Sequence, residues 1–278
     1  MRPVAIPLHI KKFWALQTAP EELISIIQKN YTKLSNGHPE VSIVIPAFNE
    51  EKNILQTLAS LTANATSRPV QIIVVNNNSV DKTEALVKAT GIECITETKK
   101  GITAARNAGL QFARGKYILN ADADAIYPPA WIEQMVKPLA SNEKIAATYG
   151  RFSFIPVAST PRVVYFFYEY MADVIRYINK YFKEEAVNVY GFNSGFRKQQ
   201  GLAVEGFHHP PGSNEDGWLA LKLRNKGFGK LHYVTNAKAL VWTTDRRIEM
   251  DGGLIKGIIK RISKLLFPGK EIAVRADL

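Results

Sequence analysis

Between residues 41 and 120, short β-branched runs alternate with amphipathic stretches of helical length. The first run is residues 42–45, Ser-Ile-Val-Ile, and the second is residues 71–75, Gln-Ile-Ile-Val-Val. Short apolar runs bounded by polar clusters are typical of buried strands, and the stretches between them have helical periodicity. Strands separated by helices favour a parallel, right-handed βαβ sheet. We therefore predict an α/β fold with a mostly parallel, Rossmann-like sheet flanked by helices.

Polar clusters follow three of the expected strands directly, at residues 46–50, 76–79 and 122–124. Ligands of such sheets bind beyond the carboxyl ends of the strands. Asp122 and Asp124 are two positions apart at a strand end, so their side chains are expected to project to the same side. Two carboxylates with open coordination positions suit Mg²⁺ or Mn²⁺ that also binds a diphosphate. The sequence therefore predicts a metal site at these two aspartates.

Composition narrows the partners and the compartment. The formal net charge of +11 indicates an anionic partner, and nucleic acid, an anionic membrane and a phosphorylated substrate all agree with that sign. The only cysteine, Cys94, excludes an intramolecular disulfide and a thiolate zinc cluster. No stretch reaches the roughly 18 apolar residues that span a bilayer, and the first ten residues lack a signal-peptide core. We expect a cytoplasmic protein, with peripheral attachment to the inner face of the cytoplasmic membrane as a further option.

Four segments, in this order, resemble the motifs of family 2 glycosyltransferases. The first resembles the opening strand and nucleotide-binding loop of that family, and the second its next strand-end motif. The third is similar to the helix before the metal motif, and the fourth to the Glu-Asp motif that opens a later helix. The segments are residues 42–50, residues 74–83, residues 101–109 and residues 214–216, the last followed by Trp218, Leu219 and Leu221.

This resemblance implies a GT-A fold and an inverting transfer from a UDP- or GDP-sugar to a hydroxyl of a glycan or lipid-linked glycan. It places Asp216 as the general base on the acceptor hydroxyl. The alternative for Glu215 and Asp216 is that they only complement the dipole of the helix they begin. The donor-side residues that it implies are Pro46, Asn49, Glu50, Asn76, Arg106, Asp122 and Asp124, the last two also holding Mn²⁺ or Mg²⁺.

The sequence departs from the family pattern at two places. Asn76 stands where the family usually has aspartate, so a neutral amide replaces a charged contact to the base. Residues 242–247, Trp-Thr-Thr-Asp-Arg-Arg, do not match the Gln-x-x-Arg-Trp motif of processive members, which favours single addition. Arg246 and Arg247 are expected to pair with the donor diphosphate or with a lipid-phosphate acceptor, or else to be solvated. On the acceptor side we further expect Asn193, Arg197 and Glu215.

The chain is expected to divide into an N-terminal extension (1–38), a nucleotide-sugar-binding half (39–150), an acceptor-binding half of the same domain (151–247) and a basic amphipathic tail (248–278). Residues 254–267 alternate lysine and arginine with a wide apolar stripe, so they either bind an anionic membrane or pack on the domain. Residues 163–182 form a second, aromatic-rich helical pattern. We expect this helix to pack in the core or against another helix, or to line an acceptor groove.

Three other functions are consistent with parts of the sequence. A nucleotidyltransferase also uses a parallel sheet and paired aspartates, but residues 46–50 lack the glycine and lysine that grip a triphosphate. A nucleic-acid-binding protein fits the net charge, yet the basic residues are dispersed and enriched at the tail, so we expect no nucleic acid partner. A non-enzymatic nucleotide-sugar-binding protein is disfavoured because Asp122, Asp124 and Asp216 are all present.

Overall fold

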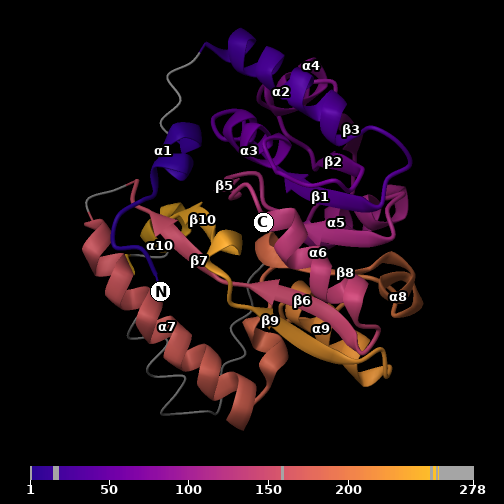
Figure 1. Ribbon diagram of the computed structural model, residues 1–278, viewed down its shortest axis with the longest axis vertical. Helices are drawn as coiled ribbons and strands as arrows, with labels where there is room; N and C mark the ends of the chain where they lie inside the picture. Colours follow the sequence, from indigo (N-terminus) through magenta and orange to yellow (C-terminus); the bar gives the residue numbers. More distant parts are fainter. Residues whose placement is uncertain (1, 15–18, 158–159, 251–252, 255, 257–278) are drawn as a thin grey trace.

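The computed structural model of the chain describes residues 2–14, 19–157, 160–250, 253, 254 and 256 (Figure 1), but not the side chain of Arg247. Its centre is a seven-stranded sheet in the order β3-β2-β1-β4-β8-β6-β9. These strands are β1 (Val41–Ala47), β2 (Val70–Asn76), β3 (Glu93–Thr96), β4 (Tyr117–Asn120), β6 (Ile145–Gly150), β8 (Ser194–Arg197) and β9 (Lys230–Val234).

Only β8 runs against its neighbours in this sheet. β1 pairs in parallel with β2 and β4, β2 pairs in parallel with β3, and β6 pairs in parallel with β9. β8 is antiparallel to both β4 and β6. A smaller sheet has the order β5-β10-β7, with β5 (Ala125–Ile126), β7 (Phe152–Ile155) and β10 (Val241–Thr244). The prediction of a mostly parallel α/β sheet is confirmed.

Helices cover both faces of the parallel strands. Along β1, Ile43 and Ile45 belong to one core cluster with the apolar side chains of α3. Val44, between them, belongs to a second cluster on the opposite face with Ala105 and Leu110 of α5. Such strands, buried on both faces, read as continuous apolar runs, as residues 42–45 do. The helices of the first half are α1 (Leu8–Trp14), α2 (Pro20–Leu34), α3 (Ile54–Thr62), α4 (Thr83–Ala89), α5 (Ile102–Phe112) and α6 (Trp131–Ser141).

The second half contributes one long helix, α7 (Arg162–Phe182), at the outer edge of the molecule (Figure 1). Its inward side chains, such as Tyr165 and Tyr168, are buried, but Phe167, Tyr177 and Phe182 are exposed. The expectation of core packing is therefore wrong for the outward face of this helix. The remaining elements are η1 (Glu185–Asn188), η2 (Gly191–Asn193), α8 (Lys198–Ala203), α9 (Glu215–Asn225), η3 (Ala237–Ala239) and α10 (Arg246–Met250).

None of the helices within the described residues combines the length and the apolar content needed to cross a bilayer. Nearly all of the basic segment 254–267 lies outside the described residues, as does most of the expected tail that contains it.

Candidate active site

Asp122 and Asp124 follow β4 at the carboxyl edge of the sheet, where the sequence predicts them. The backbone N–H of Ala121 donates to the carbonyl of Val44 at 3.0 Å, which extends the β1–β4 pairing up to the first aspartate. The N–H of Asp122 then donates to the hydroxyl of Tyr127 at 2.9 Å, and that hydroxyl donates to the carbonyl of Phe192 at 3.1 Å. The buried Tyr127 therefore fixes the position of Asp122, a role for which the sequence carries no recognisable signal.

Arg106 joins the two halves of the chain at this edge. Its guanidinium, only 1% exposed, lies 3.0 Å from Asp122, 3.4 Å from Asp216 and 4.0 Å from Glu215, measured between nitrogen and carboxylate oxygen. Burial alone lowers the pKa of this arginine, but the surrounding carboxylates outweigh it, so the pKa is raised and the cation is retained. A carboxylate of the first half and one of the second half thus meet at a single buried cation.

Asp216 lies in the first turn of α9, where the Asn214 side chain accepts a hydrogen bond from the N–H of Gly217 at 2.7 Å. The carboxyl is 4% exposed. Burial raises its pKa well above the usual range; Arg106 lowers it, and the negative charges of Glu215 and Asp122 raise it further. Asp216 therefore lies at the start of a helix and also contacts Arg106. It does more than complement the helix dipole.

The raised pKa of Asp216 predicts a displaced pH profile if this carboxylate acts as a base. The base form is lost as the pH falls through the pKa, so the rate should fall in the same window. That acid limb should lie above the pH at which an exposed aspartate titrates, whose pKa is about 3.9. The measurement is kcat as a function of pH. A rate that stays constant down to about pH 4 would contradict the prediction.

Gly191 forms the wall of this cluster. A Cβ at this position would overlap Nη2 of Arg106 and Oδ2 of Asp216. We expect Gly191→Ala to displace these groups and to lower kcat about 10- to 100-fold, because small misplacements at a reacting centre are costly. Gly227→Ala is the control: its φ of +87° makes a side chain strained, but open space surrounds it. Equal losses of stability with equal kcat values in the two variants would contradict the prediction. The close approach at Gly191 would then matter for folding and not for the reaction.

Arg246 pairs with two carboxylates at the same edge of the sheet. Its guanidinium lies 2.6 Å from Glu50 and 3.0 Å from Asp124, and its side chain is 40% exposed. Asp122 and Asp124 are thus paired with two different arginines. Arg247 follows in α10, but its side chain lies outside the described residues, so the expectation for it stays a prediction.

Asn49 joins the loop after β1 to the loop after β2, and Asn76 makes contacts within the second of these loops. The side chain of Asn49, at a φ of +54°, accepts a hydrogen bond from the N–H of Val80 at 2.9 Å. Asn76 is buried; its amide donates to Glu84 at 2.8 Å and its oxygen accepts from Ser79. The loops of β1 and β2 are therefore adjacent, as the sequence predicts.

Asn77 is a positioning residue of these loops that the sequence analysis did not identify. Its side-chain oxygen accepts from the N–H of Gly101 at 2.9 Å, and its amide donates to the carbonyls of Glu97 and Lys99. Asn77 therefore attaches the loop before α5, the helix that carries Arg106. An asparagine after a strand is a signal for a turn, but the distant loop that it binds is invisible in the sequence.

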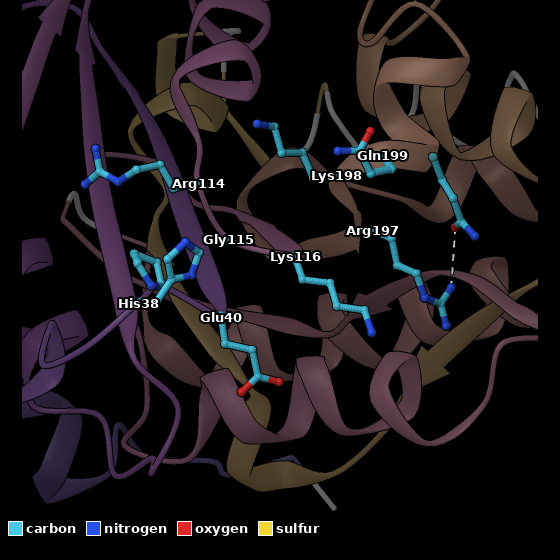
Figure 2. A pocket seen from close by; sticks show the side chains of 10 residues that line it. His38, Glu40, Arg114, Gly115, Lys116, Arg197, Lys198 and Gln199 are labelled. Carbon is cyan, nitrogen blue, oxygen red and sulfur yellow. Dashed lines mark hydrogen bonds between the residues drawn. The ribbon is translucent and has the colours of Figure 1, made fainter.

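The structure does not bring all of the expected acceptor-side residues to this edge. Arg197 pairs with Tyr117 at the start of β4, at the opposite edge of the sheet from Asp122. Figure 2 shows Arg197 at a cavity of about 610 Å³, and its guanidinium donates to the carbonyls of Leu139 and Ile145. The acceptor-side expectation for Arg197 is therefore corrected: this side chain binds the backbone next to the end of α6. His38, Arg114, Lys116 and Lys198 also line this cavity.

Asn193 lies closer to the carboxylates than Arg197 does. Both polar atoms of its side chain are already hydrogen-bonded within the protein. Its oxygen accepts from the indole N–H of Trp131 at 2.8 Å, and its amide donates to the carbonyl of Arg151 at 2.7 Å. It is the last residue of η2 and directly precedes β8, whose first residue, Ser194, pairs with Asn120. Contact of Asn193 with a substrate stays a prediction.

A mostly parallel sheet with acidic residues at its carboxyl edge, joined to a second half that supplies a further carboxylate, agrees with the GT-A fold that the sequence resemblance implies. The chain belongs to glycosyl transferase family 2, whose family model matches residues 42–200, more than half of its length.

Two relatives of known sequence each match less than half of the chain. The chain is 33% identical over 121 residues to "Uncharacterized protein MJ1222" of Methanocaldococcus jannaschii, a match covering 42% of this chain and 49% of that protein. It is 35% identical over 132 residues to "Probable glycosyltransferase YdaM" of Bacillus subtilis, covering 44% of this chain and 31% of that protein. These matches span about half or less of the relatives' own length.

Solved structures share the fold at low sequence identity. Staphylococcus aureus TarS 1-349, in complex with UDP, superposes with a TM-score of 0.57 at 16% identity, over 74% of this chain and 60% of that one. The mannosyltransferase PcManGT of Pyrobaculum calidifontis, in complex with GDP-Man and Mn²⁺, has a TM-score of 0.55 at 18% identity, over 92% and 76%. Glucosyl-3-phosphoglycerate synthase of Mycobacterium tuberculosis, with Mn²⁺, UDP and phosphoglyceric acid, has a TM-score of 0.54 at 17% identity, over 87% and 81%.

Proposed function

We propose that this protein transfers a sugar from a UDP- or GDP-sugar to a hydroxyl of a glycan or lipid-linked glycan, with inversion at the anomeric carbon. The observation that carries the proposal is the pairing of one buried cation, Arg106, with Asp122 and Asp216. An inverting displacement needs groups that stabilise the leaving diphosphate and a base on the far face of the sugar. Asp122 of the first half and Asp216 of the second half lie on either side of Arg106. In this proposal Asp122 belongs to the diphosphate side and Asp216 supplies the base.

Asp216 is the general base of this proposal. Burial and the neighbouring acids raise its pKa, which makes its carboxylate a stronger proton acceptor than an exposed aspartate. Arg106, 3.4 Å away, orients this carboxylate and favours its charged form. The proton of the acceptor hydroxyl moves to Asp216 as the acceptor oxygen attacks the anomeric carbon and the sugar–phosphate bond breaks.

The donor lies along the loops after β1, β2 and β4 in this proposal. Pro46, Asn49 and Asn76 surround the base and ribose, and Glu50 lies beside them. Arg246 is half-exposed and lies between Glu50 and Asp124, so its guanidinium can exchange a carboxylate for a diphosphate oxygen. Solved structures with this fold in complex with UDP or with GDP-Man support the class of donor.

Asp122 and Asp124 are the residues that would hold Mn²⁺ or Mg²⁺. Carboxylate oxygens are suitable ligands for both ions, and both aspartates reach the same edge of the sheet. Within the described part of the chain, no three His, Cys, Asp or Glu side chains are grouped closely enough to hold a metal. Two protein carboxylates leave coordination positions for phosphate oxygens and water. When bound, the ion would neutralise negative charge on the leaving diphosphate.

The proposal is tested by incubating the protein with UDP-, GDP- and dTDP-sugars and measuring nucleoside diphosphate release with Mn²⁺, with Mg²⁺ and with EDTA. Slow release with water as acceptor should be detectable for one donor and should require the metal. Release of pyrophosphate from a nucleoside triphosphate and a sugar phosphate would instead indicate a nucleotidyltransferase. Binding of a nucleotide sugar without turnover under any added acceptor would indicate a binding protein.

A further inference from the structure

The outward face of α7 is apolar throughout. Eight positions of this helix are exposed, and each carries valine, tyrosine or phenylalanine. Contiguous exposed apolar surface of this kind marks an interaction site. The side chains are Val163, Val164, Phe167, Tyr170, Val174, Tyr177, Tyr181 and Phe182.

Most of these side chains form one continuous stripe. Positions 163, 167, 170, 174, 177 and 181 are separated by alternating steps of four and three residues, so they lie on one side of the helix. At 1.5 Å of rise per residue, the stripe is about 27 Å long. The exposed rings also contact each other, with Tyr177 and Tyr181 centroids 4.7 Å apart.

The inward face of α7 carries its acidic residues. Glu169 and Asp173 are the only acids in the helix, and both bind Arg2, at 3.3 Å and 2.6 Å between charged atoms. Arg176 adds a further ion pair with Asp173 at 2.6 Å. Rotating the helix to bury its aromatic face would break these ion pairs and leave buried charges unpaired, which is costly. The ion pairs therefore hold the apolar stripe toward the outside.

Charge distinguishes between the possible occupants of this face. The exposed stripe holds no acid, whereas Lys180, which pairs with Glu185 at 3.8 Å, and the exposed Lys183 lie at its C-terminal end. A second copy of the chain would bring the same acid-free face and another net charge of +11. An anionic bilayer complements both the apolar stripe and the positive charge. Tyrosine and phenylalanine also suit the boundary between headgroups and acyl chains.

We propose that the outer face of α7 docks this protein on an anionic bilayer, with the helix lying along the membrane surface. Among the described helices none can span a bilayer, so the contact is in the plane of the interface. This surface is separate from residues 254–267. The inference goes beyond the proposed transfer reaction and does not depend on it.

The test compares sedimentation with two kinds of vesicle, phosphatidylcholine alone and phosphatidylcholine mixed with phosphatidylglycerol. The variant is Phe167→Gln with Phe182→Gln, whose side chains are 67% and 75% exposed, so the fold should be retained. The matched control is Val80→Gln with Phe112→Gln, two exposed apolar residues on other elements. We expect the natural chain and the control to bind the anionic vesicles, and the α7 variant to bind about tenfold or more weakly.

Two results would overturn the proposal. If the α7 variant binds anionic vesicles as well as the natural chain, another segment, such as residues 254–267, makes the contact. If the natural chain ignores vesicles but is a dimer in sedimentation velocity, and the α7 variant is a monomer, this face binds a second copy. Circular dichroism and thermal unfolding of all three proteins exclude a loss of fold as the cause.

Discussion

Asp216→Asn should lower the rate of sugar transfer by about 10³-fold while leaving the dissociation constant of the donor within about threefold. The amide keeps the size of the carboxylate and its place in the first turn of α9, but it cannot accept the acceptor's proton. The proposed donor contacts lie at the loops of β1, β2 and β4, so the loss should appear in kcat. Single-turnover transfer and calorimetric donor binding measure the two quantities separately.

Glu215→Gln is the matched control for this variant. It removes the adjacent carboxylate of the same helix turn, which lies 4.0 Å from Arg106, compared with 3.4 Å for Asp216. We expect a loss of less than about tenfold from it, because Glu215 acts on the proton acceptor only indirectly, through its charge and a side-chain hydrogen bond to Asp216. Equal losses in the two variants would mean that both act through Arg106. A donor affinity that falls in parallel with the rate in Asp216→Asn would exclude the base role.

The parallel sheet and its acidic edge were predictable because they rest on local patterns. The apolar run that forms β1 and the Asp-x-Asp spacing after β4 are readable from a few neighbouring residues. The order of the motifs along the chain then indicated that Asp216 belongs with Asp122. Strand-end positions follow from the geometry of a parallel sheet, so the donor-side loops were predictable without any knowledge of long-range contacts.

Contacts between distant segments were not predictable in the same way. Tyr127 positions Asp122 through its hydroxyl, but its sequence neighbourhood is that of any buried aromatic residue. Arg197 ends the antiparallel strand β8, so it reaches the edge opposite to the carboxylates; the direction of that strand cannot be read from its four residues. For α7, the sequence predicted an aromatic-rich helix, but it could not show that part of the aromatic surface, such as Phe167 and Phe182, is exposed rather than packed in the core.

The second large effect concerns the metal. Asp122→Asn and Asp124→Asn should each reduce metal-dependent transfer by about 100-fold or more, because each removes one of two proposed carboxylate ligands. The direct readout is the binding of Mn²⁺ in the presence of UDP, measured by calorimetry or by the electron paramagnetic resonance signal of free Mn²⁺. Both variants should bind Mn²⁺ more weakly than the natural chain.

The two variants should differ in their free energy of unfolding. Asp122 is paired with Arg106, which is 1% exposed, so Asp122→Asn should also lower the free energy of unfolding, by about 1–3 kcal/mol. Asp124 is itself only 8% exposed, but its partner Arg246 is 40% exposed and keeps Glu50 as a partner, so Asp124→Asn should lower stability less than Asp122→Asn does, by about 1 kcal/mol. Asp124→Asn is therefore the cleaner test, since a loss of Mn²⁺ binding in a protein that stays folded assigns the aspartate to the metal. Full activity and unchanged Mn²⁺ binding in that variant would instead leave Asp124 only the structural role of holding Arg246.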